Sequence, residues 1–123
     1  MKKKILIIDD EVGFVSLVKL NLEETGQYEV ETENKGAKGL VAAKRFKPDL
    51  ILLDVIMPDM QGNEVIQQLE NNADTKNIPV VFLTAIVTPK ETAEEGGIVA
   101  GRAFIAKPVS IQKLIEVIKE NVG

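Results

Sequence analysis

A run of four large apolar residues, Leu50 to Leu53, ends abruptly at Asp54, and Pro58 follows soon after it. An unbroken apolar run of this length is typical of a strand that is buried on both faces, as in a parallel sheet. In open α/β sheets, the ligand crevice lies outside the carboxyl ends of the strands. The sequence therefore predicts that Asp54 is the centre of a functional site and that the rest of the chain places groups around it.

Strand-like and helix-like segments alternate along the chain. The predicted strands cover residues 5–8, 28–32, 50–53, 78–83 and 103–106. Helical patterns begin near Val12, Ala37, Gly62, Thr88 and Ser110. The first helix is expected to end at Gly26 in a left-handed conformation, the second before Pro48, and Ser110 is expected to cap the last. About five strands alternating with about five helices indicate an α/β fold with right-handed crossovers between parallel strands.

Composition narrows the possible chemistry. The 123 residues suffice for one domain, residues 1–123, with a single core. A net charge of −4 argues against a broad nucleic-acid-binding surface, so we expect no direct nucleic acid binding. The chain has no cysteine and no histidine, which leaves carboxylates, lysine, threonine and serine as the reactive groups.

Neither a signal peptide nor a membrane span is predicted. The apolar run at residues 5–8 meets Asp9 at once, so it is too short for a secretory segment. No stretch approaches the roughly 18 apolar residues that a membrane span requires. We therefore expect a cytoplasmic protein that makes no membrane contact.

Polar residues of a particular kind follow four of the predicted strands. They are Asp9 and Asp10, Asp54, Thr84 and Lys107. Because parallel strands end at one edge of the sheet, these side chains are expected to converge. Clustered carboxylates raise one another's pKa unless a cation lies among them, and oxygen ligands favour Mg²⁺. The sequence therefore predicts a Mg²⁺ site held by Asp9 and Asp10.

This set of groups suits phosphoryl transfer, in which positioning and charge neutralisation supply most of the catalysis. Without cysteine or histidine, Asp54 is the plausible nucleophile and would form an aspartyl phosphate. Lys107 would pair with the phosphoryl group, and the Thr84 hydroxyl would donate a hydrogen bond to it.

Four short motifs occur in order, each at the end of a predicted strand. They are Asp9-Asp10, the segment Asp54-Val55-Ile56-Met57-Pro58 with Gly62 beyond it, Thr84-Ala85 and Lys107-Pro108. With these motifs the whole chain resembles the receiver domain of bacterial two-component response regulators, in a single-domain form similar to a chemotaxis regulator. The resemblance implies a flavodoxin-like (βα)5 sandwich of three layers, whose doubly wound, five-stranded parallel sheet has the order 2-1-3-4-5.

The resemblance also implies a phosphorylation-activated switch. Asp54 would accept a phosphoryl group from a sensor histidine kinase or a histidine phosphotransfer protein, and the surface seen by an unknown downstream partner would change. Asp10 and Asp54 would bind Mg²⁺ directly together with the backbone carbonyl of Ile56, while Asp9 would act largely through water. Beyond self-phosphorylation and slow self-dephosphorylation, no enzymatic activity is expected.

Further expectations concern the switch residues and the positions at which this chain departs from the family. Thr84 and Phe104 occupy the switch positions, and the Lys107-Pro108 peptide is expected to be cis. Residues 88–102, with three glycines, depart most from the family, so the fourth helix is expected to be short or irregular. Ile56 and Ile86 are apolar, and we expect them to restrict water and slow self-hydrolysis of the phosphate.

Other functions remain open at this point. A phosphohydrolase with an aspartyl-phosphate intermediate commonly carries a second acid two residues after the nucleophile, where this chain has Ile56. A flavin- or nucleotide-binding domain of the same topology is a second alternative. There the phosphate of the ligand would be repelled by Asp9, Asp10 and Glu11. A receiver that never takes phosphate is a further alternative, although no site position is missing. The domain is expected to be either stand-alone or excised from a longer regulator.

Overall fold

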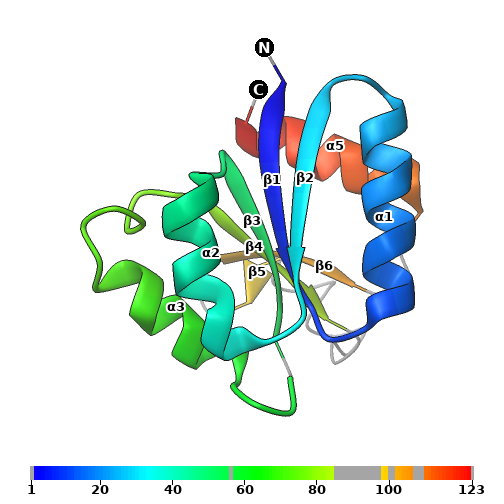
Figure 1. Cartoon of the computed structure of the whole chain (residues 1–123). Helices are drawn as coiled ribbons and strands as arrows, with labels where there is room; N and C mark the ends of the chain where they lie inside the picture. The colour runs from blue at the N-terminus through cyan, green and yellow to red at the C-terminus, as the bar shows by residue number, and fades with distance from the viewer. Residues whose placement is uncertain (1, 56, 85–97, 100–101, 107–109, 123) are drawn as a thin grey trace.

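A computed structural model describes residues 2–55, 57–84, 98–99, 102–106 and 110–122, and it confirms the alternation of strands and helices (Figure 1). The strands are β1 (Lys3–Ile8), β2 (Tyr28–Glu33), β3 (Leu50–Asp54), β4 (Val80–Thr84), β5 (Ile98–Val99) and β6 (Arg102–Ala106). The helices are α1 (Val12–Glu24), the 3-10 helix η1 (Gly36–Lys38), α2 (Gly39–Phe46), α3 (Gly62–Glu70) and α5 (Ile111–Val122).

The sheet has the order β2-β1-β3-β4-β6-β5. All neighbours from β2 to β6 pair in parallel, so the predicted order is confirmed with β6 as the fifth parallel strand. Strand β5 pairs antiparallel with β6 and was not predicted, because a strand of 2 residues is too short to show a periodic pattern. The predicted helix at residues 88–95 lies outside the described residues.

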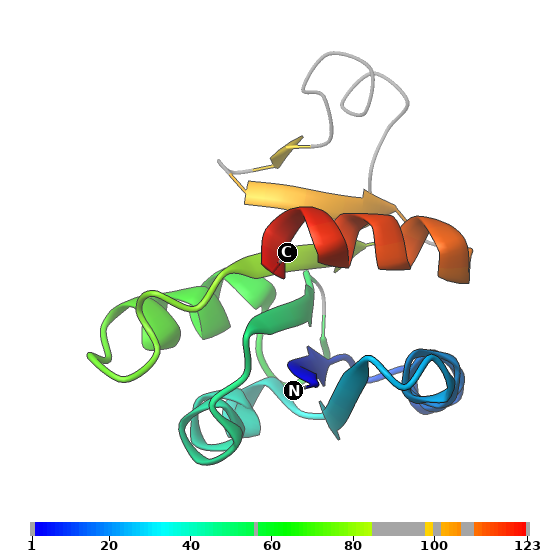
Figure 2. The ribbon, with the colours of Figure 1, turned by 90° about the horizontal axis from the view of Figure 1, so that it is seen from above.

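Helices cover both faces of the sheet, with α1 and α5 on one side and α2 and α3 on the other (Figure 2). Strand β3 shows why this arrangement forms, because all 5 of its residues are buried. Leu50 and Leu52 belong to the core under α1 and α5, whereas Ile51 and Leu53 belong to the core under α2 and α3. Successive residues of a strand point to opposite faces, so each of these four positions needs an apolar residue.

Helix ends follow the expected turn chemistry. Gly26 has a φ of 75°, as a left-handed residue after α1 requires. Lys47 takes the same role after α2 with a φ of 54°, and Pro48 follows it. The backbone N–H of Lys113 donates to Ser110 Oγ at 3.1 Å, which confirms the predicted cap of α5.

Helix α1 packs through Val15, Val18 and Leu22, which are buried. Tyr28, at the start of β2, joins the same core and is 3% exposed. Among the helices that the structure describes, none is long and apolar enough to cross a membrane.

Candidate functional site

The register of the sheet brings Asp9 beside Asp54. Ile8 in β1 pairs with Leu53 in β3, and each of these residues is followed directly by one of the two aspartates. Both are buried, with Asp9 0% and Asp54 6% exposed. The structure therefore places these acids together at the carboxyl edge of the sheet, where the sequence predicted them.

A third acid, Glu11, completes the group. Asp9, Glu11 and Asp54 each offer one carboxylate oxygen, and these oxygens all lie within 4.8 Å of one another. The backbone N–H of Glu11 donates to Asp9 Oδ1 at 2.9 Å. This hydrogen bond between an aspartate and the residue two positions on is an Asx turn, and it directs the chain from β1 into α1. Sequence reasoning did not assign Glu11 to the site, because the Asx turn uses only its backbone N–H and sets no requirement on its side chain.

The donor set fits a hard divalent cation. All three ligands are carboxylate oxygens, the type that Mg²⁺ prefers. Two oxygens bound to one octahedral Mg²⁺ lie roughly 2.9 to 4.1 Å apart, so only a small closing movement is needed from the present separation. Among the described residues, Asp10 is half-buried and does not belong to this group.

The connection between β3 and α3 is held close to Asp54. The Gly62 N–H donates to the Val55 carbonyl at 2.7 Å, and the Val55 N–H donates to the Leu83 carbonyl at 3.2 Å. A Cβ at Gly62 would lie 2.9 Å from both the Asp54 carbonyl oxygen and the Val55 Cα. Only glycine lets the start of α3 approach the end of β3 this closely, which gives Gly62 of the family-like motif a physical role.

Asp59, in the same connection, bonds to a distant part of the chain. Its Oδ1 accepts a hydrogen bond from the Gly36 N–H at 3.1 Å, and its Oδ2 accepts one from the Ala37 N–H at 3.0 Å. The Ala37 hydrogen bond, helped by the Gly36 bond and the nearby charge of Lys35, holds the pKa of Asp59 below its ordinary value. Asp59 is therefore ionised at neutral pH, and both of its oxygens can accept.

The remaining predicted site residues are placed only in part. Thr84 ends β4 opposite Ala106 of β6, and Phe104 pairs with Phe82, so both predicted switch positions lie on neighbouring strands. Other predictions fall outside the described residues: the placement of Lys107, the Lys107-Pro108 peptide, and the surroundings of Ile56 and Ile86.

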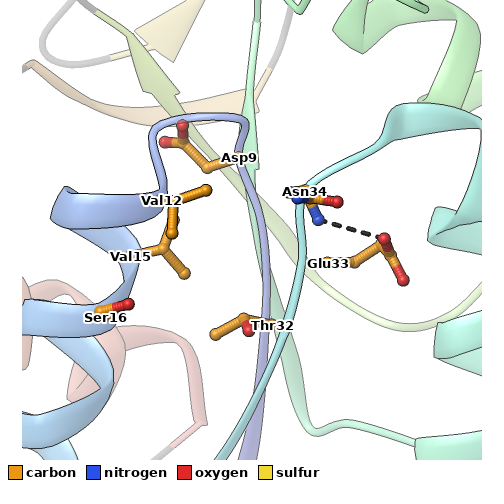
Figure 3. A pocket seen from close by; sticks show the side chains of 7 residues that line it. All are labelled: Asp9, Val12, Val15, Ser16, Thr32, Glu33 and Asn34. Carbon is orange, nitrogen blue, oxygen red and sulfur yellow. Dashed lines mark hydrogen bonds between the residues drawn. The ribbon is translucent and has the colours of Figure 1, made fainter.

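A cavity of about 260 Å³ adjoins the acid group between α1 and the end of β2 (Figure 3). The side chains of Val15 and Thr32 point toward each other across it, and Asp9 lies at its edge. The Asn34 N–H donates to Glu33 Oε1 at 3.1 Å beside the same cavity. Asp9 both lines the cavity and belongs to the acid group, so the two are neighbours, and no sequence pattern indicated the cavity.

Comparison with known proteins agrees with this geometry. The family model for the response regulator receiver domain matches residues 5–119. The polar-differentiation response regulator DivK of Brucella anthropi is 33% identical over 125 residues, which cover 100% of this chain and 98% of DivK. DivK is thus similar to this chain over nearly its whole length.

Two solved structures show the likeness in three dimensions. The chemotaxis protein CheY4 of Vibrio cholerae has a TM-score of 0.83 and 29% identity, covering 98% of this chain and 99% of CheY4. The receiver domain of the sensor histidine kinase PA1611 from Pseudomonas aeruginosa PAO1, which holds a magnesium ion in its active-site cleft, has a TM-score of 0.83 and 21% identity and covers 100% and 99% of the two chains. The buried acids at the carboxyl edge, the strand order and the match of the family model over most of the chain lead to one conclusion: the chain belongs to the response regulator receiver domain family.

Proposed function

We propose that Asp54 is the phosphoacceptor of this two-component receiver domain and that Mg²⁺ binds beside it. Receiver domains are phosphorylation-activated signalling switches that take phosphate on an aspartate. The observation that carries the assignment is the group of three carboxylate oxygens from Asp9, Glu11 and Asp54 within 4.8 Å of one another. Asp54 is the member that ends the central, fully buried strand β3.

The reaction follows from these groups. A carboxylate oxygen of Asp54 attacks the phosphorus of a phosphohistidine, the bond from phosphorus to the imidazole nitrogen breaks, and the electron pair remains on that nitrogen. The product is an aspartyl phosphate on Asp54. When bound, Mg²⁺ neutralises charge on the transferring phosphoryl oxygens. Asp9 and Glu11 would hold the cation, and the burial of Asp9 and Asp54 limits the water that competes with the phosphoryl group.

The roles of other residues are proposals supported by the family resemblance. Asp10 and the backbone carbonyl of Ile56 are proposed as metal ligands in addition to the group seen here. Lys107 would pair with the phosphoryl group, and Thr84 and Phe104 would act as the switch. A cis Lys107-Pro108 peptide and a slow self-dephosphorylation favoured by Ile56 and Ile86 remain predictions.

The donor and the cation follow from relatives. Receiver domains interact with histidine kinases and phosphotransfer proteins in general, and we propose a donor of this kind for Asp54. The magnesium ion in the Pseudomonas aeruginosa receiver domain supports Mg²⁺ at the corresponding edge of this chain. The downstream partner stays unidentified, and the cytoplasmic location stays a prediction.

The test is phosphorylation by acetyl phosphate with Mg²⁺, followed by the mass of the intact protein. We expect one phosphoryl group per chain, and none when EDTA is present throughout the incubation or when Asp54 is replaced in Asp54→Asn. Asp74→Asn is the matched control, because Asp74 is an exposed aspartate in a turn at the opposite edge and should leave the mass increase unchanged. A mass increase that persists in Asp54→Asn would contradict the assignment of Asp54 as phosphoacceptor. Repeated turnover of a phosphomonoester would favour a phosphohydrolase instead.

A further inference from the structure

The loop that follows Asp54 is closed at its neck and tied at its far side. The neck is the hydrogen bond from the Gly62 N–H to the Val55 carbonyl at 2.7 Å. The tie is Asp59, whose two oxygens accept from the Gly36 and Ala37 N–H groups at 3.1 and 3.0 Å. These amides belong to η1, which lies 22 to 23 residues earlier in the chain, so the tie joins two separate connections of the carboxyl edge.

The two connections also pack against each other. Gly36 is buried, and a Cβ there would lie 3.0 Å from the Met60 Cβ and 3.1 Å from the Met57 Cε. Met57 is itself 4% exposed and belongs to the core under α2 and α3. The segment 57–60 is therefore held by buried contacts on one side and by the Asp59 hydrogen bonds at its exposed margin.

The hydrogen bonds of Asp59 matter for the site because only a few residues separate Asp59 from Asp54. Asp59 lies five residues beyond Asp54 in the sequence. Because Val55 is hydrogen-bonded to Leu83 and Gly62, movement is restricted at the neck, and the two Asp59 hydrogen bonds restrain the segment 57–60. Outer groups that orient metal ligands commonly affect metal affinity as well as stability.

We propose that Asp59 is a positioning residue for the phosphoacceptor site. It holds the 57–60 segment on Gly36 and Ala37 and thereby restrains the loop that follows Asp54. The inference rests on the proposed function, because the site being positioned is the proposed Mg²⁺ and phosphoacceptor site at Asp54. A carboxylate suits the task, since its two oxygens accept from two successive amides at once.

A capping role confined to η1 predicts something different. If Asp59 only stabilised η1, its removal would lower the melting temperature and leave Mg²⁺ affinity unchanged well below that temperature. If Asp59 positions the loop, Mg²⁺ affinity and the rate of phosphorylation fall together in protein that is still folded. Asp59 makes none of the contacts that define the acid group, so its effect on Mg²⁺ would have to pass through the loop.

The experiment uses the full chain labelled with 15N and compares wild type with Asp59→Ala, Asp59→Asn and Asp74→Ala. Asp74→Ala removes the same charge from an exposed turn at the opposite edge and is the control. Amide exchange at Gly36 and Ala37 is measured without metal, Mg²⁺ affinity by titration of the amide spectrum, and phosphorylation by acetyl phosphate. We expect faster exchange at both amides and about tenfold weaker Mg²⁺ binding in Asp59→Ala, at the low end of effects from outer-shell groups.

Asp59→Asn keeps one acceptor oxygen and should give intermediate values, and it carries the test if Asp59→Ala does not fold. Unchanged Mg²⁺ affinity in a folded Asp59 variant would overturn the proposal, even if its melting temperature fell. Unchanged exchange at Gly36 and Ala37 would overturn it as well, independently of any metal. If wild-type protein bound no Mg²⁺ and took no phosphate, the proposed function would fail first, and the exchange data would show separately whether the tie exists.

Discussion

The two edges of the sheet hold clusters of charged side chains in opposite surroundings. At the carboxyl edge, Asp9 and Asp54 are buried and their oxygens lie close to that of Glu11. At the amino edge, Lys2, Lys3 and Lys119 are exposed around an open cavity of about 440 Å³. Exposed lysines keep their hydration, whereas buried carboxylates of like charge destabilise the fold unless a cation or hydrogen bonds compensate them. The difference teaches that burial, rather than charge count, separates a site from a solubilising edge.

The largest expected effect comes from filling the close approach at the carboxyl edge. In Gly62→Ala the new Cβ would meet backbone atoms of Asp54 and Val55 at 2.9 Å, and backbone cannot move aside cheaply. We expect the free energy of unfolding to fall by about 3 kcal/mol, the upper range for overpacking. Urea denaturation followed by circular dichroism measures this change.

Gly13→Ala is the matched control for that substitution. Gly13 lies within α1, and a Cβ there meets nothing within 4 Å. Alanine in a helix should instead raise the free energy of unfolding by about 0.5–1 kcal/mol. Equal losses in the two variants would contradict the close packing described for the Asp54 edge.

The next effect is stabilisation by Mg²⁺, which should act through the carboxyl edge alone. A ligand at a hundred times its dissociation constant stabilises the folded state by about 2.7 kcal/mol. Thermal unfolding at increasing Mg²⁺ should show this rise in wild type and in Lys3→Ala, and a much smaller rise in Glu11→Gln. A full response in Glu11→Gln would remove Glu11 from the cation site and return the role to Asp10.

The smallest effect is expected at the amino edge. Lys3→Ala and Lys119→Ala each remove an exposed charge, for which the change in unfolding free energy is typically within about 0.5 kcal/mol. Urea denaturation at neutral pH is again the measurement. A loss several times larger would show that these lysines make compensating contacts and would erase the contrast between the two edges.

Sequence patterns foretold the parts of the site that depend on topology. Asp9 and Asp54 directly follow apolar runs, and parallel pairing brings the ends of such runs together whatever the loops do. Glu11 and Asp59 were not foreseen, because their positions depend on loop conformation. An Asx turn places Glu11, and Asp59 bonds to amides that are distant in the sequence. No local pattern encodes a hydrogen bond across that separation.

The unforeseen parts of the fold have the same origin. Strand β5 spans Ile98–Val99, which is too short to alternate visibly, and its pairing with β6 is a tertiary event. The core was predicted more completely. Because β3 is apolar at each position from Leu50 to Leu53, both of its faces must be covered, which indicates a helical layer on each side of the sheet.

The position of Tyr28 determines what optical signals the protein offers. It is the chain's only tyrosine, and there is no tryptophan. Burial raises the pKa of its hydroxyl, and the ring lies in the core at the amino edge, away from Asp54. Its ultraviolet emission should therefore follow cooperative unfolding and stay nearly constant when phosphate or metal arrives at the opposite edge. A reporter of activation needs an added fluorophore, and Met60→Trp would place one in the loop that holds Asp59.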